Sequence, residues 1–175
     1  MGKSGSGKST CVKYLVNTLE NVHEVIKCTT RPPRNYEEDG RNYHFLSIPE
    51  FTEKVVDSSL IEVTSFRDWF YGTAIEDLDK DKINIGVLDP DGYEIMKDDP
   101  RINLFPVYLY VPDKELLIRS LKREKDPDYE EIFRRFLADK KDFEDFTLNF
   151  NGLIYNNYDG RASSDILTEL DNFIK

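Results

Sequence analysis

A phosphate-binding loop motif at the start of the chain restricts its fold more than any other feature. Residues 2–9 read G-K-S-G-S-G-K-S, which matches the pattern G-x-x-x-x-G-K-[ST]. In such a loop the backbone N–H groups point inward at phosphate oxygens, and the following helix adds the positive end of its dipole. That helix is predicted by apolar residues at helical spacing: Val12, Leu15, Val16 and Leu19. A triphosphate-binding loop is therefore favoured over the alternative, a flexible Gly/Ser-rich end.

The motif predicts a role for its polar residues. We expect Lys8 to reach the β and γ phosphates as a point charge, and the Ser9 hydroxyl to ligate Mg²⁺. The expected ATP-binding residues are Gly2, Ser4, Gly5, Ser6, Gly7, Lys8, Ser9 and Thr10.

The strand that normally launches such a loop is missing, because only Met1 precedes Gly2. Loss of a central strand leaves backbone groups unpaired on its neighbours. We therefore expect that the natural chain starts several residues earlier, or that tag residues or a neighbouring copy of the chain fill the gap. A folded chain with a misplaced, inactive loop is the alternative.

Length and charge narrow the class of protein. The 175 residues suffice for one compact domain. The net charge of −10 repels nucleic-acid backbones and leaves small phosphorylated ligands to local clusters of Arg. The two cysteines lack metal-ligand spacing, which indicates a reduced, intracellular protein without structural zinc. Because the sequence has neither a membrane-spanning run nor a signal-peptide core, we expect a cytoplasmic protein that binds no nucleic acid polymer and no membrane.

Strand and helix patterns alternate along the chain. Apolar runs rich in β-branched and aromatic residues predict strands at 22–28, 43–46, 60–66, 83–88, 104–111 and 153–155. Helical spacing predicts helices at 8–19, 49–56, 75–79, 114–122, 129–143 and 164–173. Ser47 followed by Glu50 predicts a capping box. The fold expected is α/β, a P-loop NTPase-type parallel sheet core with helices on both faces, a small acceptor-binding region and a lid.

Five further motifs follow the phosphate loop in order. They are T-T-R-P-P-R at 29–34, G-x-x-Y-x-F at 40–45, L-I-E at 60–62, Y-G-T at 71–73 and L-D-x-D at 88–91. Together with the loop they resemble the guanylate kinases, from Gly2 to about Asn157. Six motifs in the right order are much more specific than any single one.

The resemblance implies a site that grips the phosphate of an acceptor monophosphate. Arg34, Tyr43 and Tyr71 take that role, and arginine suits bidentate phosphate contacts. Arg31 is expected to lie between acceptor and donor phosphates and to neutralise the transferring group. A solvated Arg-Pro-Pro-Arg turn is the alternative interpretation of this segment.

Base recognition is expected from Glu62, a carboxylate within an apolar strand. The N1–H and N2–H₂ groups of guanine are adjacent donors, so one carboxylate can accept from both. The resemblance adds Thr73 and Asp91, while an exposed position on an edge strand remains the alternative for Glu62. Lys27 departs from the family, which commonly has a small hydroxyl residue there. It can donate to guanine O6, but it leaves base specificity open.

The resemblance also implies a lid. Arg119, Arg123 and Arg135 align with arginines that cover the donor phosphates, although Arg119 and Arg123 could instead form an exposed helix face. Asp89 is expected as a second Mg²⁺ ligand, acting through water, or alternatively as a helix cap. The predicted catalytic residues are Lys8, Arg31, Arg119, Arg123 and Arg135.

The sequence thus predicts a single domain over residues 1–175. Its core is residues 1–29 and 76–175, the acceptor-binding region is 30–75, and the lid is about 119–135. The expected reaction transfers the γ-phosphoryl group of ATP to GMP or dGMP, giving ADP and GDP, in a monomer or homodimer. Alternatives are a kinase for another nucleoside monophosphate, which Lys27 suggests, and a catalytically inactive guanylate kinase-like binding module.

Overall fold

The computed structural model describes residues 1–34, 37–123, 125–144, 146, 152–157 and 160–174. The chain forms two compact units, one of Met1–Leu15 with Asn103–Lys175 and the other of Val16–Ile102. These boundaries differ from the predicted division at 29/30 and 75/76, which stays a prediction. Within the predicted lid, Glu124 lies outside the described residues.

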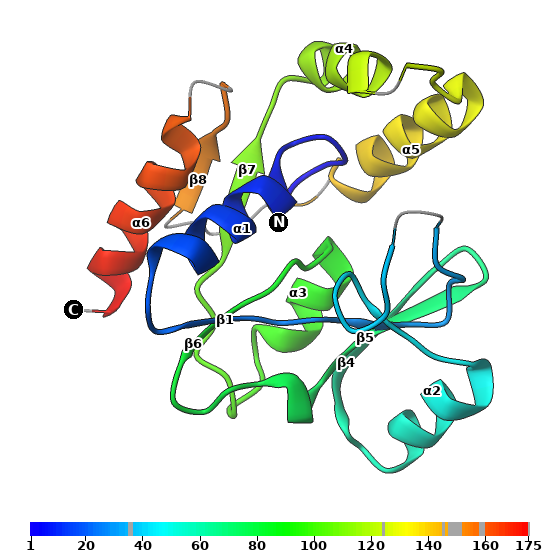
Figure 1. Cartoon of the computed structure of the whole chain (residues 1–175), viewed down its shortest axis with the longest axis vertical. Helices are drawn as coiled ribbons and strands as arrows, with labels where there is room; N and C mark the ends of the chain where they lie inside the picture. Colours follow the sequence, from blue (N-terminus) through cyan, green and yellow to red (C-terminus); the bar gives the residue numbers. More distant parts are fainter. Residues whose placement is uncertain (35–36, 124, 145, 147–151, 158–159, 175) are drawn as a thin grey trace. The chain divides into compact units, whose positions relative to one another are not determined.

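The first unit contains the phosphate loop and a parallel pair of strands (Figure 1). Strands β7 (Val107–Tyr110) and β8 (Gly152–Tyr155) pair in parallel, with Val107 opposite Gly152. A parallel pair needs a long crossover, and this one includes α4 (Asp113–Arg123) and α5 (Tyr129–Asp142). The remaining helices are α1 (Lys8–Thr18), which continues into the second unit, and α6 (Arg161–Ile174).

Met1 forms backbone hydrogen bonds with β7, as a residue of a neighbouring strand would. Its amino group donates to the carbonyl oxygen of Val107 at 2.6 Å, and the N–H of Leu109 donates to the carbonyl oxygen of Met1 at 2.9 Å. The phosphate loop therefore leaves directly from the side of β7.

Helices with one apolar face cover this strand pair. Leu109 and Ile154 are buried on the strands, and Leu116 is buried on α4. Cys11 of α1 and Ser163 of α6 are in contact, with Oγ and Sγ 3.6 Å apart. This contact joins α1, which follows the loop, to α6.

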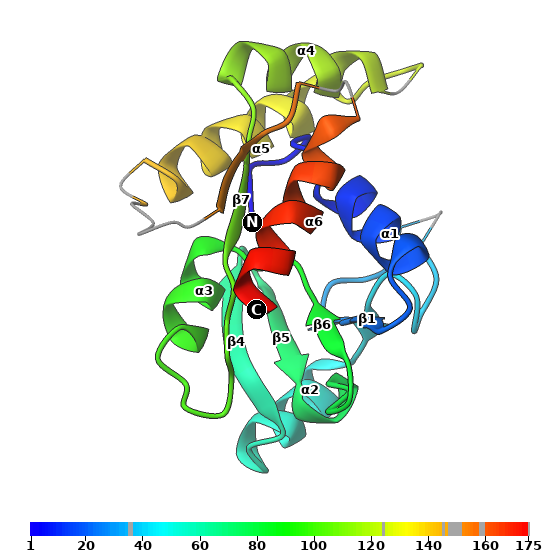
Figure 2. The same cartoon turned by 90° about the vertical axis from the view of Figure 1, so that its left-hand side faces the viewer.

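The second unit is built from two small sheets. Strands β1 (Val22–Glu24) and β6 (Ile83–Ile85) pair in parallel. The other sheet has the order β3-β2-β5-β4, in which β2 (Cys28–Thr29) and β3 (His44–Phe45) are parallel. Strands β4 (Leu60–Phe66) and β5 (Trp69–Ala74) form an antiparallel hairpin, and Figure 2 shows them side by side.

Short helices complete the second unit. They are α2 (Ile48–Val56), a single 3₁₀ turn (Ile75–Asp77) and α3 (Pro90–Met96), which contacts β4. Buried Cys28, Phe51 and Ala74 form a small core against which Leu46, Leu60 and Val63 pack. The capping box of Ser47 and Glu50 is confirmed at the start of α2.

The predicted α/β fold is confirmed, two local predictions are corrected, and two elements were missed. The run 22–28 is divided between β1 and β2, which belong to different sheets. The expected helix at 75–79 is only the 3₁₀ turn. Strand β5 and helix α3 were not predicted. Among the described residues, no helix is both long and apolar enough to cross a bilayer.

Candidate active site

The phosphate loop of the first unit folds around its own lysine. Lys8 Nζ donates to the carbonyl oxygens of Gly2, at 2.7 Å, and of Lys3, at 3.0 Å. The N–H of Ser6 closes the loop by donating to Lys3 O at 3.1 Å. Burial lowers the pKa of Lys8 from its ordinary value, and the negative charge of Asp139 acts in the opposite direction. The ammonium group thus lies inside the loop that was predicted to hold phosphates.

Asn156, which sequence reasoning left without a role, supports this loop. Its Nδ2 donates to the carbonyl oxygen of Ser6 at 2.8 Å, in a buried contact. Gly7 has φ +96°, and a Cβ atom there would collide with Asn156 Nδ2. Asn156 directly follows β8, which positions its side chain. The strand predicted at 153–155 was therefore the sequence signal that could have pointed to this residue.

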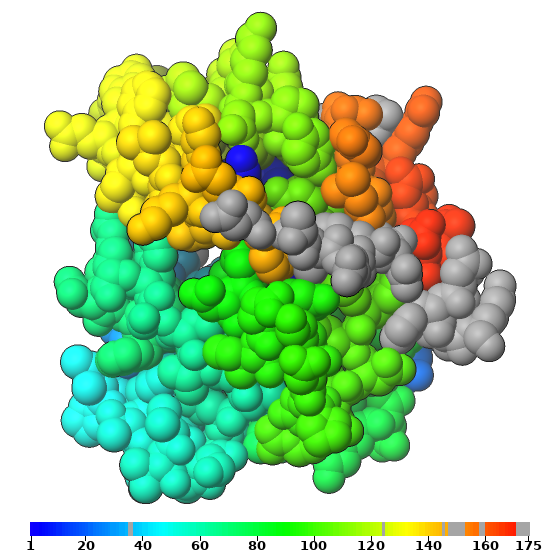
Figure 3. Space-filling view, turned by 180° about the vertical axis from the view of Figure 1, so that it is seen from behind, coloured from blue at the N-terminus to red at the C-terminus, as the bar shows by residue number. Residues whose placement is uncertain are grey.

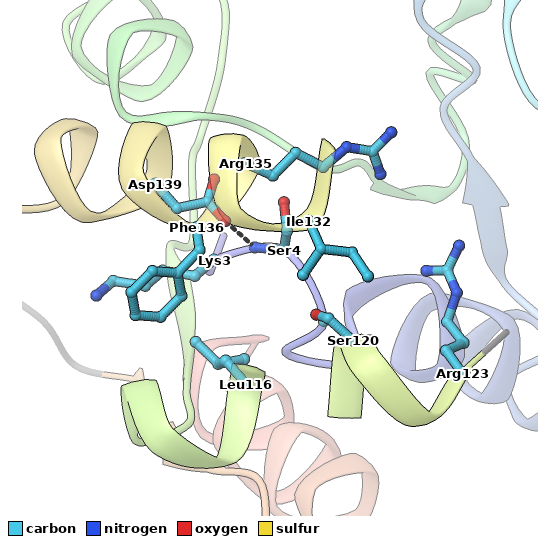
Figure 4. A pocket seen from close by; sticks show the side chains of 10 residues that line it. Lys3, Ser4, Leu116, Ser120, Arg123, Ile132, Arg135, Phe136 and Asp139 are labelled. Carbon is cyan, nitrogen blue, oxygen red and sulfur yellow. Dashed lines mark hydrogen bonds between the residues drawn. The ribbon is translucent and has the colours of Figure 1, made fainter. Parts of the chain in front are cut away.

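A cavity opens beside the loop, between α4 and α5 (Figure 4). Arg123 and Arg135 both extend toward the same side of it, away from Phe136. In the space-filling view, part of the N-terminal segment is visible at the bottom of a hollow bordered by the segments that carry α4 and α5 (Figure 3). The cavity is lined by Lys3, Ser4, Gly5, Leu116, Ser120, Arg123, Ile132, Arg135, Phe136 and Asp139.

The three predicted lid arginines have different surroundings. Arg123 and Arg135 line the cavity, and Arg135 Nε donates to Glu131 at 2.6 Å. Arg119 is not among the lining residues. Its Nη2 donates to the carbonyl oxygen of Asn156 at 3.2 Å. Arg119 therefore holds the backbone of Asn156, whose side chain in turn supports the loop.

Asp139 is a second residue that sequence reasoning missed. Its carboxylate accepts a hydrogen bond from the backbone N–H of Ser4, one of the loop amides. A carboxylate at this point places negative charge where a phosphate-binding loop would otherwise present only donors. No sequence pattern connects the two residues, which lie 135 positions apart.

In the second unit, an ion pair orders the Arg-rich segment after β2. Arg31 Nη2 lies 2.9 Å from Glu37 Oε1 and from Oε2, and its Nη1 donates to Pro32 O at 2.8 Å. The guanidinium group also lies over the rings of Tyr43, 5.4 Å away, and Phe45, 5.6 Å away. Arg31 is therefore almost completely buried.

Glu37 joins both predicted phosphate-binding arginines. It accepts from the backbone N–H of Arg34 at 2.8 Å, and Arg34 Nη1 lies 3.6 Å from Oε1. Burial opposes ionisation of Glu37, but the hydrogen bonds and charges of Arg34 and Arg31 outweigh it and lower its pKa. Tyr43 and Tyr71 meet edge to face with centroids 6.1 Å apart, and burial raises the pKa of Tyr43.

Glu62 is fully buried, which contradicts the exposed-edge alternative. Thr73 Oγ1 donates to its Oε1 at 2.8 Å, and Lys27 Nζ also lies 2.8 Å from Oε1. Within the described part of the chain, Oε2 has no hydrogen-bond partner. The predicted residues Lys27 and Thr73 thus both contact Glu62, whereas Asp91 is exposed on α3.

Asp89 caps the N-terminus of α3, as the alternative interpretation predicted. Its Oδ1 accepts from the N–H of Gly92 at 2.7 Å, and Thr64 Oγ1 donates to Oδ2 at 3.2 Å. Ser9 is exposed in the first turn of α1, in the other unit. The described residues contain no group of three or more His, Cys, Asp or Glu side chains arranged to hold a metal.

A glycine-rich loop that begins beside the parallel strand β7 and opens a helix, with arginines lining the adjacent cavity, defines the first unit as the nucleotide-binding part of a P-loop kinase fold. The same fold occurs in the crystal structure of guanylate kinase from Anaplasma phagocytophilum, with a TM-score of 0.72 and 21% sequence identity. That likeness covers 98% of this chain and 83% of the other.

Sequence relatives and a family model identify the family. The model described as Guanylate kinase matches residues 1–175. Guanylate kinase of Helicobacter hepaticus is 31% identical over 159 residues, which cover 89% of this chain and 79% of the relative. Guanylate kinase of Fusobacterium nucleatum is 27% identical, over 99% of this chain and 95% of the relative. The chain belongs to the guanylate kinase family, a family of phosphotransferases that act as nucleoside monophosphate kinases.

Proposed function

We propose that this chain phosphorylates GMP or dGMP with ATP. An oxygen of the acceptor phosphate forms a bond to the γ phosphorus, and the bond from that phosphorus to the β–γ bridging oxygen breaks. ADP leaves with the electron pair of the broken bond, and GDP or dGDP is the other product. The acceptor phosphate is its own nucleophile, so no protein base is required.

The buried carboxylate of Glu62 carries the proposal. A carboxylate without exposure to water is costly unless its oxygens are paired, yet Oε2 has no partner among the described residues. The N1–H of guanine is a donor of the kind that this oxygen lacks. This buried acceptor favours a nucleotide site over a binding module that has lost its nucleotide.

The phosphate of the acceptor is assigned to the arginine and tyrosine cluster of the same unit. Arg34 and Tyr71 would contact the phosphate together with Tyr43, and Arg31 would face the transferring group. The support is that Glu37 already binds Arg31 and Arg34 through two carboxylate oxygens, which shows that this cluster accommodates an oxyanion.

The donor triphosphate is assigned to residues 2–10, with Lys8 on its β and γ phosphates. Arg123 and Arg135 would cover those phosphates from the cavity side, and Arg119 would act through Asn156. Positive charge and exclusion of water then provide the catalysis.

Mg²⁺ is part of this proposal, held mainly through phosphate oxygens. The Ser9 hydroxyl is a hard oxygen ligand, and each Asp89 oxygen keeps one acceptor position beyond its bond to Thr64 or Gly92. Either ligand would leave most positions around a Mg²⁺ ion to water and phosphate oxygens, as suits a partly hydrated ion. When bound, the ion neutralises charge on the transferring group. We also expect the protein to act in the cytoplasm, as a monomer or homodimer.

A coupled ADP-release assay tests the acceptor. With ATP and Mg²⁺, we expect GMP and dGMP to give a higher kcat/KM than UMP, dTMP or AMP. Glu62→Gln should lower kcat/KM for GMP by about 10–100-fold, because a hydrogen bond to a charged group contributes about 1.5–3 kcal/mol. Glu53→Gln, an exposed change on α2, is the control. No turnover with any monophosphate would favour the inactive binding module.

A further inference from the structure

We propose that α5 is an interface between two copies of this chain, which pair in antiparallel orientation through an apolar stripe of Tyr129, Phe133 and Leu137. The stripe lies on a side of the helix that takes no part in lining the cavity. The inference is independent of the proposed function, because it concerns how copies of the chain associate without any nucleotide.

The stripe is exposed along its whole length. Its three residues are four positions apart, so they follow one another along one side of α5. Tyr129, Phe133 and Leu137 are 58%, 47% and 63% exposed. Single apolar side chains on a surface are ordinary, whereas apolar side chains that adjoin one another there mark interaction sites. The stripe is therefore a candidate contact surface.

The side of α5 that faces the cavity already packs within the chain. Ile132, Arg135, Phe136 and Asp139 line the cavity (Figure 4), and α5 contacts α4. One apolar side is enough to hold a surface helix in a fold. Contact through the stripe would add a second packed side to α5 and would leave the cavity open to its ligand.

The balance of charge favours a second copy as the partner. The chain as a whole carries a net charge of −10, so two copies repel each other over most approaches, and an anionic membrane surface is repelled as well. Helix α5 differs, because it carries four acidic and four basic side chains. Two copies can thus meet through α5 without bringing together an excess of one charge.

Two charged residues beside the stripe determine the orientation of the pair. Glu130 lies in the first turn of α5 and Lys141 in the last, and both are exposed. At 3.6 residues per turn, both lie on the side of the stripe that Leu137 borders. In an antiparallel pair, Glu130 of each copy faces Lys141 of the other. A parallel pair would bring equal charges to the same level and align the two helix dipoles unfavourably.

The size of the surface predicts a weak dimer. A helix of 14 residues is about 21 Å long, and a single pair of such helices buries less than the roughly 1,200 Å² of a standard interface. The two contact surfaces are identical, so the dimer closes on itself with two-fold symmetry. We expect reversible association with a Kd on the order of 10–100 µM.

Sedimentation velocity of the full chain, without nucleotide and from about 1 to 500 µM, is the first test. The wild type should change from monomer to dimer over this range. Phe133→Ala/Leu137→Ala should stay monomeric, because it removes most of the apolar contact and changes only exposed positions. Val55→Ala/Val56→Ala, at two exposed apolar positions on α2, is the matched control and should dimerise like the wild type.

Exchange of the two flanking charges tests the orientation. Glu130→Lys and Lys141→Glu should each raise the Kd of the dimer by about three- to tenfold, since each replaces two attractions with two repulsions at the rim. The variant that carries both changes restores opposite charges across the interface and should return to within about twofold of the wild type. A change confined to the stability of the single helix would not be restored in this way.

Three results would overturn the inference. They are a wild type that is monomeric at every concentration, a dimer that Phe133→Ala/Leu137→Ala retains, and a combined charge variant that is weaker than either single one. Sedimentation with phosphatidylcholine vesicles covers the other occupant. Wild type that binds them through the stripe, with no dimer in their absence, would assign the stripe to a lipid surface.

Discussion

The side-chain amide of Asn156 donates to the carbonyl oxygen of Ser6 at 2.8 Å, and so ties the end of β8 to the phosphate loop. The two residues are 150 positions apart, and both are buried. The shape of the loop therefore depends on the C-terminal part of the chain as well as on the glycine-rich motif itself.

Replacement of Asn156 should destabilise this loop. In Asn156→Ala the carbonyl oxygen of Ser6 loses its buried donor, which costs about 1–3 kcal/mol of unfolding free energy. We expect a higher KM for ATP as well, because the loop amides lose their fixed positions. Chemical denaturation and initial rates measure both effects. Asn157→Ala, at an exposed neighbour, is the control. Equal behaviour of the two variants would show that the contact does not matter.

Gly7→Ala should weaken ATP binding more than backbone strain alone would. Gly7 has φ +96°, and its Cβ would collide with Asn156 Nδ2. Gly40→Ala isolates the backbone effect, because Gly40 has φ +71° with nothing within 4 Å of its Cβ position. A non-glycine residue at positive φ costs about 1–2 kcal/mol. ATP binding by calorimetry should be lost only in Gly7→Ala. Intact binding there would refute the steric argument.

Asp139→Asn should tighten the binding of ATP. The carboxylate of Asp139 accepts from the Ser4 N–H and lies in the cavity with Arg123 and Arg135, where it would repel a triphosphate. Its removal should lower KM for ATP by about three- to tenfold, as expected for a charge near a protein surface. The asparagine oxygen can still accept from Ser4. Asp142→Asn, exposed on the same helix, should leave KM unchanged. A raised KM would instead make Asp139 a required support of the loop.

The ion pair between Arg31 and Glu37 should make stability depend on pH. The pKa of Glu37 is lowered in the folded protein, so its contribution is fully present above the unfolded value of about 4.3. This contribution is lost as the pH falls through the folded pKa. Wild type should therefore exceed Glu37→Gln in unfolding midpoint at pH 7, and the difference should shrink below about pH 4. A difference that is constant with pH would show that the charge of Glu37 does not contribute.

The fold was predictable where local pattern determines structure. The loop motif and the capping box of Ser47 and Glu50 each specify backbone geometry within a few residues. Strand β5 was missed because Arg67 and Asp68, the turn of its hairpin, lack the Gly or Asn that usually marks such turns, and Arg67 still adopts φ 58°. Helix α3 was missed because Pro90 and Gly92 are poor helix formers, although Asp89 before Pro90 is a recognisable start signal.

The candidate site was predictable in its motifs but not in the residues that position them. Asp139 and Asn156 act through tertiary contacts, which they make with the loop across more than 130 positions, whereas Glu37 bonds to arginines three and six positions before it in an irregular segment. A charged residue in such a role looks the same in sequence as one on a solvated helix face. Lys27 was noticed only as a departure from the family, and the structure then placed it on Glu62.

Transfer of label from ATP to GMP tests the central claim most directly. With ATP labelled at the γ phosphate, we expect labelled GDP to form in equal amount to ADP, and Lys8→Met to reduce the rate by about a hundredfold or more. Release of ADP together with labelled inorganic phosphate and no labelled GDP would contradict the account, because the chain would then hydrolyse ATP without transferring its phosphoryl group to the acceptor.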